Sequence, residues 1–461
     1  MRLAILGTGP GGYVAAIKAA QLGAQVLIIE KDEVGGTCLN WGCIPTKTLK
    51  ASADALATVK GLGNYGIELN GNIVPDLSRM IDRKNKVVST LVKGIKGLFT
   101  SWGIVLKNGR GTLQAPGEIS VVLKDGSTEI VTADSIIIAT GSRPSEIPTL
   151  PFDGKHVISS TEALEIRDIP RSLLVVGAGV IGCEFACIFR ELGSEVTIVE
   201  ALPHAVATED EEISLILEKE LKKKKIKLIT GKTVEKTGIQ EDGVHALLSD
   251  GKEVVAEKVL VSIGRTLNTD GMGIEQLGIL TGTRGEILVN ERMETNVTGV
   301  YAIGDVTGRM LLAHKASAEG IVAAKNIMGI PCSMDYQVIP AAIFTSPEIA
   351  SVGLREQQAE DQGITFRKGL FPFRALGKAH AMGEITGIVK ILSDASTDRI
   401  IGAHIIGTHA ADLIHEAAVA MKAGLKARDL AETIHAHPTL SEALMEAAED
   451  VNGEAIHLPK K

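Results

Sequence analysis

The hydrophobic positions of the chain form one pattern that occurs twice. Residues 3–30 and 173–200 align without a gap, and each contains an apolar run, a glycine-rich turn, a helical stretch, a Leu-Gly pair and a second apolar run. Each copy ends in a glutamate, Glu30 or Glu200. Apolar runs that alternate with helical stretches are typical of parallel β-α-β units. The sequence therefore predicts two such units, separated by more than a hundred residues.

The remaining pattern predicts further elements around these two units. The predicted helices are 45–60, 79–102 and one whose solvated end is the lysine run 222–225. The predicted strands are short ones within 104–140 and buried ones at 135–139, 259–263 and 300–305. From about Tyr336 the pattern changes to alternating strands followed by helices, which indicates an α+β segment.

Length and composition restrict the classes of protein that fit. The chain has 461 residues and so exceeds the ~250–300 residues at which single cores stop growing, which predicts several domains. Hydrophobic residues make up 45% and charged residues 23%, the balance of a globular protein. The net charge of −8 and the aromatic content of 3% argue against a nucleic-acid binder.

The sequence offers no membrane-spanning segment and no targeting peptide. The longest apolar run, 173–183, contains three glycines and falls short of the ~18 residues that a span needs. The N-terminus has the layout of neither a secretory signal nor a transit peptide. Five cysteines are too few for a secreted disulfide scaffold, so we expect a cytoplasmic protein.

The glycine-rich turns of the two repeats predict dinucleotide binding. Each turn has the spacing G-x-G-x-x-G, and in each copy the last glycine precedes the terminal glutamate by 18 residues; the glycines are Gly7, Gly9, Gly12 and Gly177, Gly179, Gly182. The first glycine makes the turn, the second lets the backbone approach a pyrophosphate, and the third lets the helix pack on the sheet. The helix N-terminus favours the phosphate anion, and the glutamate accepts a hydrogen bond from a ribose hydroxyl. The alternative is two ordinary β-α-β units with glycines for packing, but the double occurrence favours two bound dinucleotides.

The second repeat predicts a preference for NAD(H) over NADP(H). Glu200 carries a negative charge where a 2′-phosphate would lie, and residues 201–204 supply no arginine to neutralise that phosphate.

A pair of cysteines directly follows the first repeat. Cys38 and Cys43 are five residues apart, which on an ideal helix is roughly 140° of rotation and roughly 7.5 Å of rise. A disulfide needs Cα atoms about 4.4–6.8 Å apart, so the segment must bend, and Gly42 and Pro45 are suitable breakers. A strained, accessible disulfide is easily reduced, which suits a redox catalyst.

Two alternatives for the cysteine pair stay open at this point. One is a zinc site to which Cys183 and Cys187 would add two ligands, and the other is a pair of inert buried thiols. We favour the redox pair, expect no metal site, and take Cys183, Cys187 and Cys332 as structural.

A thiol catalyst needs a base, and the segment 435–442 offers one. Pro438 keeps His437 out of helical geometry, and Thr439-x-x-Glu442 has capping-box spacing, so a helix is expected to start there. Glu442 is then either a helix cap only or the carboxylate that orients His437. His437 lies 399 residues from Cys38, so the two can meet only through folding or through a second subunit.

Together these features resemble the pyridine nucleotide–disulfide oxidoreductases, and within them the dihydrolipoyl (lipoamide) dehydrogenases. The resemblance runs from Leu3 to about Ala448. Its most specific motifs are GGTCLNWGCIPTK (35–47), GAGVIGCE (177–184), YAIGDV (301–306), LAHKA (312–316), FTSPEIASVG (344–353) and HAHPTLSEAL (435–444). Trp41 and Thr46 depart from the smaller residues expected in the cysteine loop, but the cysteine spacing is kept.

The resemblance implies an α/β fold of two Rossmann-like dinucleotide-binding domains, for FAD and NAD, and a C-terminal α+β dimerisation domain. The implied domains are the FAD domain with the redox disulfide (1–145), the NAD domain (146–270), a second part of the FAD or central domain (271–335) and the dimerisation domain (336–461). The implied FAD site is Gly7, Gly9, Pro10, Gly11, Gly12, Glu30, Lys47, Gly111, Thr140, Gly141, Ser142, Asp305, Leu311, Leu312, Ala313 and His314. The implied NAD site is Gly177, Gly179, Val180, Ile181, Gly182, Glu184, Glu200, Val234 and Gly264, with Glu184 beside Lys47.

The resemblance also implies roles and partners. Cys38 would exchange with lipoamide, Cys43 would face the flavin, and His437, paired with Glu442, would come from the other subunit of a homodimer. The enzyme would reoxidise dihydrolipoamide carried by another chain, either a lipoyl domain on the acyltransferase core of a 2-oxoacid dehydrogenase complex or the lipoyl carrier protein of glycine cleavage. The alternatives are a related flavin disulfide reductase with another disulfide substrate and a non-catalytic flavoprotein.

Overall fold

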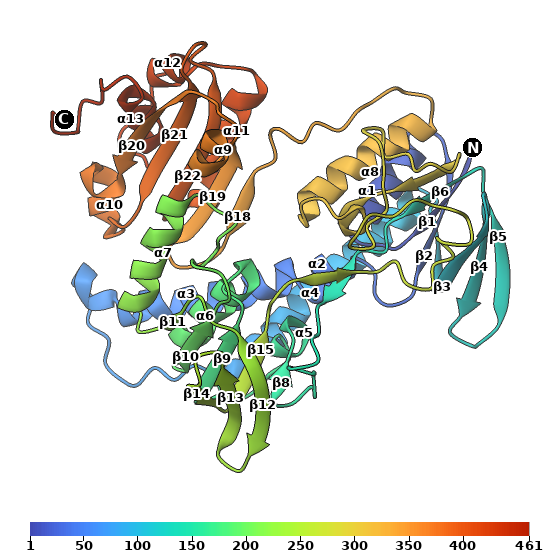
Figure 1. Ribbon diagram of the computed structural model, residues 1–461, viewed down its shortest axis with the longest axis horizontal. Coiled ribbons are helices and arrows are strands. Elements are labelled where there is room, and N and C mark those ends of the chain that lie inside the picture. The colour runs from blue at the N-terminus through green and yellow to red at the C-terminus, as the bar shows by residue number, and fades with distance from the viewer. Residues whose placement is uncertain (461) are drawn as a thin grey trace.

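The first β-α-β repeat lies in a seven-stranded sheet (Figure 1). The computed structural model describes residues 1–460. The strand order is β17-β6-β1-β2-β3-β4-β5. The strands are β1 (Arg2–Leu6), β2 (Gln25–Glu30), β3 (Val105–Ala115), β4 (Glu118–Leu123), β5 (Thr128–Thr132), β6 (Ser135–Ile138) and β17 (Val300–Ala302). β17, β6, β1, β2 and the start of β3 pair in parallel, whereas β3, β4 and β5 form an antiparallel meander. Because β17 joins this sheet, the chain returns to its first domain after the second repeat.

Two helices cover one face of this sheet. α1 (Pro10–Gln21) follows the first glycine turn, and α8 (Ala313–Ile327) packs along it (Figure 1). The packing is close because small residues meet: a Cβ atom on Gly320 would lie 2.5 Å from the Gly11 carbonyl oxygen. Strands buried on both faces explain the continuous apolar runs of β1 and β6.

The second repeat lies in a five-stranded parallel sheet of order β11-β10-β9-β15-β8. Its strands are β8 (Val157–Ile158), β9 (Ser172–Val176), β10 (Glu195–Val199), β11 (Lys227–Ile229) and β15 (Lys258–Val261), and its helices are α5 (Ser160–Ala163), α6 (Val180–Leu192) and α7 (Glu211–Lys223). An antiparallel meander of β12 (Val234–Gln240), β13 (Gly243–Leu248) and β14 (Glu253–Ala256) packs against it. The two repeats therefore fold alike, as predicted.

Two chain crossings join these halves. β7 (Ser142–Pro144), where the chain leaves the first sheet, pairs antiparallel with β16 (Arg265–Leu267), where it comes back. Asn268 donates a side-chain hydrogen bond to the Thr140 carbonyl oxygen (2.9 Å), and Thr140 donates one to the Asn268 carbonyl oxygen (2.7 Å). The crossings thus form one short ribbon rather than two independent linkers.

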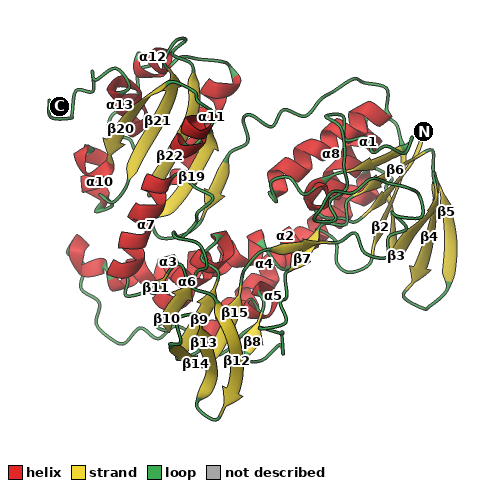
Figure 2. Ribbon diagram, viewed as in Figure 1, coloured by secondary structure: helices red, strands yellow, loops and turns green. Residues whose placement is uncertain are grey.

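The C-terminal part is an antiparallel sheet with helices on it (Figure 2). The strand order is β18-β19-β22-β21-β20, with β18 (Ala341–Ile343), β19 (Glu348–Gly353), β20 (Phe366–Pro372), β21 (Ile388–Asp394) and β22 (Ile400–Gly407). Its helices are α9 (Glu356–Asp361), the 3₁₀ turn η3 (Phe373–Ala375), α10 (Gly377–Met382), α11 (Ala410–Lys422), α12 (Ala427–Ala431) and α13 (Glu442–Asp450). This is the predicted α+β segment; residue 461, its predicted end, lies outside the described residues.

A group of helices in residues 36–101 fills the space between the three parts. It consists of α2 (Gly36–Asn40), α3 (Cys43–Lys60), the 3₁₀ turn η1 (Leu62–Tyr65) and α4 (Leu77–Ser101). Helix α6 is apolar on nearly every face because it lies inside one core shared by α3, α4 and the C-terminal strands. Helix α3 is therefore packed against the second sheet's helix α6, whereas α2 lies beside the first glycine turn.

Several predicted boundaries differ from the structure. Helix α3 starts two residues before the predicted Pro45, and α4 starts at Leu77 because the Asp76 side chain accepts a hydrogen bond from the Arg79 N–H. The strand expected over 300–305 ends at Ala302 and is followed by the 3₁₀ turn η2 (Gly304–Thr307). β3, with 11 residues, is longer than the short strands expected there because it serves both the parallel sheet and the meander.

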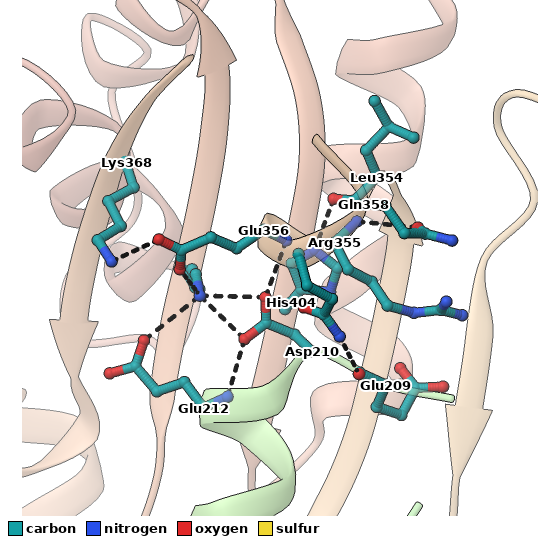
Figure 3. A network of polar contacts seen from close by, with 11 residues as sticks. Glu209, Asp210, Glu212, Leu354, Arg355, Glu356, Gln358, Lys368 and His404 are labelled. Carbon is teal, nitrogen blue, oxygen red and sulfur yellow. Dashed lines mark hydrogen bonds and ion pairs between the residues drawn. The ribbon is translucent and has the colours of Figure 1, made fainter. Parts of the chain in front are cut away.

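A buried polar network holds the second sheet against the C-terminal sheet (Figure 3). Lys390 on β21 is 1% exposed and bonds both oxygens of Asp210, the N-cap of α7, at 2.9 and 3.0 Å. It also pairs with Glu356 of α9. His404 of β22 lies beside them, and burial lowers its pKa to about 4, so its ring is neutral at pH 7. The network fixes α7 relative to the C-terminal domain.

Within residues 1–460, none of the helices combines the length and the apolar character required to cross a bilayer.

Candidate active site

The two cysteines of the predicted redox pair lie at a break between two helices. Helix α2 ends at Asn40 and α3 begins at Cys43, so the segment bends as the spacing predicted. The bend is at Gly42, where a Cβ atom would lie 2.9 Å from the Thr37 carbonyl oxygen and 3.2 Å from the Cys38 Cα. Pro45 is not a breaker; it lies in the first turn of α3, where its missing N–H costs nothing.

Cys38 and Cys43 lie close together across this bend, and each changes the pKa of the other. The pKa of Cys43 is lowered to about 7, chiefly by the hydrogen bond from Cys38 and also by the charge of Lys47. The same contact, together with burial, raises the pKa of Cys38. These shifts favour the thiolate on Cys43 and the proton on Cys38.

Lys47 connects the cysteine helix to the second repeat. It lies one helical turn after Cys43 on α3, on the same face. Its Nζ donates to both carboxylate oxygens of Glu184 on α6 at 2.8 Å, and Glu184 is 4% exposed. The structure thus places Glu184 beside Lys47, as the resemblance implied.

Phe344, which directly follows β18, completes this contact and was missed in the sequence. Its N–H donates to Glu184 Oε1 (2.9 Å), and its ring lies 4.5 Å from Lys47 Nζ. The segment 344–353 was recognised as a motif, but nothing in it indicates a contact with residues 47 and 184. The contact joins α3, α6 and the segment after β18, which are far apart in the sequence.

Both glycine turns have the space that a pyrophosphate requires. Around Gly9 and Gly179, the second glycine of each turn, no other atom lies within 4 Å of the position of a Cβ. Around Gly12 and Gly182, the third glycine, a Cβ would lie only 2.0 and 1.9 Å from a carbonyl oxygen of the same turn. Each turn opens a helix whose first N–H groups face the open side. The residues present therefore fit two dinucleotides.

The two terminal glutamates occupy equivalent positions. Glu30 accepts hydrogen bonds from the Thr8 N–H (2.8 Å) and hydroxyl (2.5 Å), and Glu200 accepts one from the Ala178 N–H (2.5 Å). The donor N–H in each case belongs to the residue after the first glycine. Each carboxylate is therefore held at its glycine turn, where a ribose would lie.

A second polar cluster lies at the predicted FAD site. The Ser142 hydroxyl donates to Asp305 Oδ2 (2.5 Å) and accepts from Arg265 Nε (2.7 Å), and Arg265 Nη2 donates to the Ser142 carbonyl oxygen (2.7 Å). The sequence predicted Ser142 and Asp305 here, 163 residues apart. It missed Arg265, which follows the predicted Gly264 and reaches across the β7–β16 ribbon.

The other predicted cofactor residues lie in different settings. Gly141 and Gly264 have positive φ values, +71° and +134°, and open space around the Cβ position. Gly111 is buried in β3, where a Cβ would lie 2.4 Å from the Leu6 side chain. Val234 opens β12 and packs in the core of the second domain. Residues 311–314 lead into α8, and a ring nitrogen of His314 is hydrogen-bonded to the Pro340 carbonyl oxygen (2.7 Å).

His437 and Glu442 are paired as predicted. His437 Nδ1 lies 2.8 Å from Glu442 Oε1, and Glu442 Oε2 accepts from the Thr439 N–H at 2.8 Å. Helix α13 starts at Glu442 and not at Thr439, and its N-cap Ser441 makes no side-chain hydrogen bond. The His437 side chain is 76% exposed, and α13 lies far from α2 within one chain (Figure 1). The structure therefore does not bring His437 to Cys38 inside a single chain.

The other three cysteines lie apart from this pair. Cys183 and Cys187 are buried one turn apart in α6, and burial raises the pKa of both. Cys332 is half-buried in the connection to the C-terminal part. Among residues 1–460, no group of three or more His, Cys, Asp and Glu side chains is arranged to hold a metal ion.

Two family models match the chain. Residues 1–320 match the pyridine nucleotide-disulphide oxidoreductase model, and residues 339–448 match the dimerisation domain of the same family. The chain belongs to the pyridine nucleotide-disulphide oxidoreductases. Membership of this family confirms the predicted fold class and adds a dimerisation domain where the sequence predicted one.

Relatives within the family match over nearly the whole length. The dihydrolipoyl dehydrogenase of Chlamydia pneumoniae is 43% identical over 457 residues, 99% of this chain and 98% of its own. That of Thermus scotoductus is 43% identical over 462 residues, again 99% and 98%. The crystal structure of LpdA from Mycobacterium tuberculosis superposes with a TM-score of 0.92 at 31% identity, covering 97% of this chain and 99% of that one. The predicted enzyme class, an oxidoreductase of sulfur groups with FAD and NAD(H) as cofactors, is confirmed by these pyridine nucleotide-disulphide oxidoreductases.

Proposed function

We propose that this chain is a dihydrolipoyl dehydrogenase in which the named residues carry out the reaction. The observation that supports this most directly is the contact of Lys47 with Glu184 and Phe344. It ties the cysteine helix to the second nucleotide unit at one point. The dithiol and the nicotinamide site are therefore close to each other, so electrons need to travel only a short distance between them.

The dinucleotide sites are assigned from the two glycine turns. FAD would be held by the first turn with Glu30, by Ser142 and Asp305, by Lys47 and by residues 311–314. NAD would be held by the second turn with Glu200, Glu184 and Gly264. FAD, when bound, supplies a two-electron carrier between the dithiol and the nicotinamide. The protein's part is to place these groups and to fix the charges around them.

The sulfur chemistry is assigned to Cys38 and Cys43. A substrate thiolate attacks Cys38 Sγ of the disulfide, and the S–S bond breaks so that Cys43 leaves as thiolate. The second substrate thiol then attacks the mixed disulfide, which releases the cyclic disulfide of lipoamide and leaves Cys38 as a thiol. Lys47 stabilises the Cys43 thiolate, since its positive charge helps to lower the pKa of that thiol.

The proton transfers are assigned to His437 of the partner subunit. Each substrate thiol must lose a proton to attack, and a neutral imidazole is the side chain suited to remove it near pH 7. Glu442 holds Nδ1, which leaves Nε2 free to act as the base. A residue that acts in the partner's site must be accessible on the surface of its own chain, and His437 is exposed in this way.

The remaining assignments concern organisation. We propose that residues 1–145 and 271–335 form the FAD domain, 146–270 the NAD domain and 336–461 the dimerisation domain. The seven-stranded sheet, the two five-stranded sheets and the β7–β16 ribbon support this division. We propose a cytoplasmic homodimer that serves lipoyl groups of a 2-oxoacid dehydrogenase or glycine-cleavage complex.

The proposed function is tested by mixing the purified protein anaerobically with dihydrolipoamide and NAD⁺ and following NADH. Rapid NADH formation is expected, with little from glutathione or with NADP⁺ in the control reactions. Flavin reduction by NADH with no turnover of dihydrolipoamide would instead indicate a flavin disulfide reductase for another substrate.

Glu200→Gln is expected to weaken the preference for NADH over NADPH by about tenfold, because it removes the charge that repels a 2′-phosphate. The readout is the ratio of kcat/KM for the two coenzymes in lipoamide reduction. Glu195→Gln is the matched control, since Glu195 is exposed at the opposite end of β10. An unchanged ratio in Glu200→Gln would remove Glu200 from coenzyme selection.

Lys47→Met is expected to raise the pKa of Cys43 above its value of about 7, because the charge of Lys47 favours the thiolate. In reduced wild-type protein, alkylation of Cys43 by iodoacetamide should rise with pH around a midpoint near 7, and the midpoint should move upward in the variant. Lys50→Met is the control, because Lys50 lies on the same helix and pairs with Asp54. Equal midpoints in all three proteins would contradict the assignment.

A further inference from the structure

A buried ion pair lies directly behind the turn that carries Asp305. Lys315 and Glu319 face each other one turn apart on α8, with 3.2 Å between Nζ and Oε2, and both side chains are 0% exposed. Neither residue belongs to the predicted cofactor sites. Two charges without access to water are costly unless their other hydrogen-bonding positions are filled, so their partners show what the pair holds.

The first partner is the main chain of Gly304. Its N–H donates to Glu319 Oε2 (2.7 Å), and its carbonyl oxygen accepts from Lys315 Nζ (3.1 Å). Both polar groups of one peptide residue are thus bound by the same ion pair. Asp305 is the next residue in the chain, so the direction of its carboxylate depends on how Gly304 is held.

The second partner is Tyr336, in the connection to the C-terminal domain. Its hydroxyl donates to Glu319 Oε1 at 2.7 Å. Burial and the nearby Glu319 raise the pKa of Tyr336, so the hydroxyl keeps the proton that it donates. The Arg309 guanidinium lies 4.6 Å above the same ring, two residues before the predicted FAD segment 311–314.

Helix α8 links this cluster to the first glycine turn as well. The Ser317 hydroxyl donates to the Pro10 carbonyl oxygen (3.3 Å), and Gly320 packs on Gly11. One helix therefore contacts the pyrophosphate turn, the Asp305 turn and the interdomain connection.

We propose that Lys315, Glu319 and Tyr336 are positioning residues for the flavin: they fix the Gly304–Asp305 turn, and through Tyr336 they couple the flavin site to the connection that enters the dimerisation domain. This inference rests on the proposed FAD site. Replacement of a buried ion pair by apolar residues is often neutral for stability or even favourable, which argues that this pair serves placement rather than stability.

The decisive variant is Tyr336→Phe, which removes the hydroxyl and keeps the ring beneath Arg309. Glu319 then loses one of its hydrogen-bond donors, and the Gly304 turn loses part of its support. We expect the Kd for FAD to rise about tenfold, the cost of one hydrogen bond to a buried charge, and the visible circular dichroism of the bound flavin to change. Glu319→Gln should weaken FAD binding by about 100-fold, because it disturbs both partners. If Glu319→Gln does not fold, Tyr336→Phe decides alone.

Two matched controls separate placement from stability. Tyr65→Phe removes a tyrosine hydroxyl in another part of the molecule, which donates to the Met382 carbonyl oxygen (2.7 Å). It should change neither the Kd for FAD nor the circular dichroism of the bound flavin. Lys390→Met breaks a different buried lysine cluster, so it should lower the Tm while the Kd for FAD and the flavin spectrum of the folded protein stay as in the wild type.

The measurement is FAD titration of deflavinated full-length protein, followed by circular dichroism of the reconstituted enzyme. The inference is overturned if Tyr336→Phe binds FAD within about twofold of the wild type with the same spectrum, or if Lys390→Met weakens FAD binding equally. If the wild-type protein oxidises dihydrolipoamide in the same preparations, the proposed function stands whether or not this inference is overturned. Wild-type protein that binds no FAD would overturn both proposals.

Discussion

A Cys43→Ser variant should lose dihydrolipoamide oxidation by at least about 1,000-fold, because a serine hydroxyl can neither form the disulfide nor leave as a stable anion near pH 7. FAD and NAD(H) binding should persist, since Cys43 belongs to neither glycine turn. NADH oxidation with an artificial electron acceptor, which bypasses the thiols, should therefore continue. The measurement compares both activities in the same preparation.

The matched control for this variant is Cys332→Ser. Cys332 is half-buried like Cys38, but it lies in the connection after α8. It should keep both activities. Lost turnover in Cys332→Ser, or dihydrolipoamide turnover retained in Cys43→Ser, would contradict the assignment of the redox pair.

A His437→Gln variant should keep its flavin and lose at least about 100-fold in dihydrolipoamide turnover, the low end for a general base. Glutamine preserves much of the size of the side chain but cannot take up the proton of a thiol. The control is His435→Gln, two residues away, whose ring is 2.6 Å from Glu416 and 5% exposed. Near-normal turnover in His437→Gln would remove this residue from the mechanism.

Mixed dimers test whether the base comes from the other subunit. Cys38→Ser and His437→Gln homodimers should each be inactive with dihydrolipoamide. A dimer of one Cys38→Ser chain and one His437→Gln chain has one site with both Cys38 and His437 intact, provided the site is shared between subunits. Differently tagged chains that are co-expressed and purified as the mixed dimer should regain about half of the wild-type activity. Mixed dimers without activity would show that each site is built within one chain.

The sequence indicated the local chemistry because that chemistry depends on spacing. The two G-x-G-x-x-G turns specify backbone shape directly: only glycine fits where a Cβ would lie about 2 Å from a carbonyl oxygen. Cys38 and Cys43 could not share a regular helix, so a bend followed from arithmetic, and the structure places it at Gly42 and not at Pro45. His437 and Glu442 are five residues apart, and a local turn suffices to pair them.

Element ends were less predictable because they depend on side-chain caps and on sheet neighbours. Asp76 caps α4 and extends it toward its N-terminus, whereas α13 starts three residues after Thr439 without a side-chain cap. β3 is long because its first residues pair in parallel with β2 and its later residues pair antiparallel with β4. Such preferences are small, and tertiary packing decides among them.

The sequence by itself determined that this protein has two dinucleotide units, and it predicted a redox-active cysteine pair between them and a histidine base near the C-terminus. Only the tertiary structure decided which charged groups surround these residues. Lys47 with Glu184 and Phe344, Ser142 with Arg265 and Asp305, and the Lys315–Glu319 pair with Tyr336 all join distant segments. Periodicity and spacing report contacts within one element, whereas a contact between elements depends on how complete domains pack, and no local pattern records that packing.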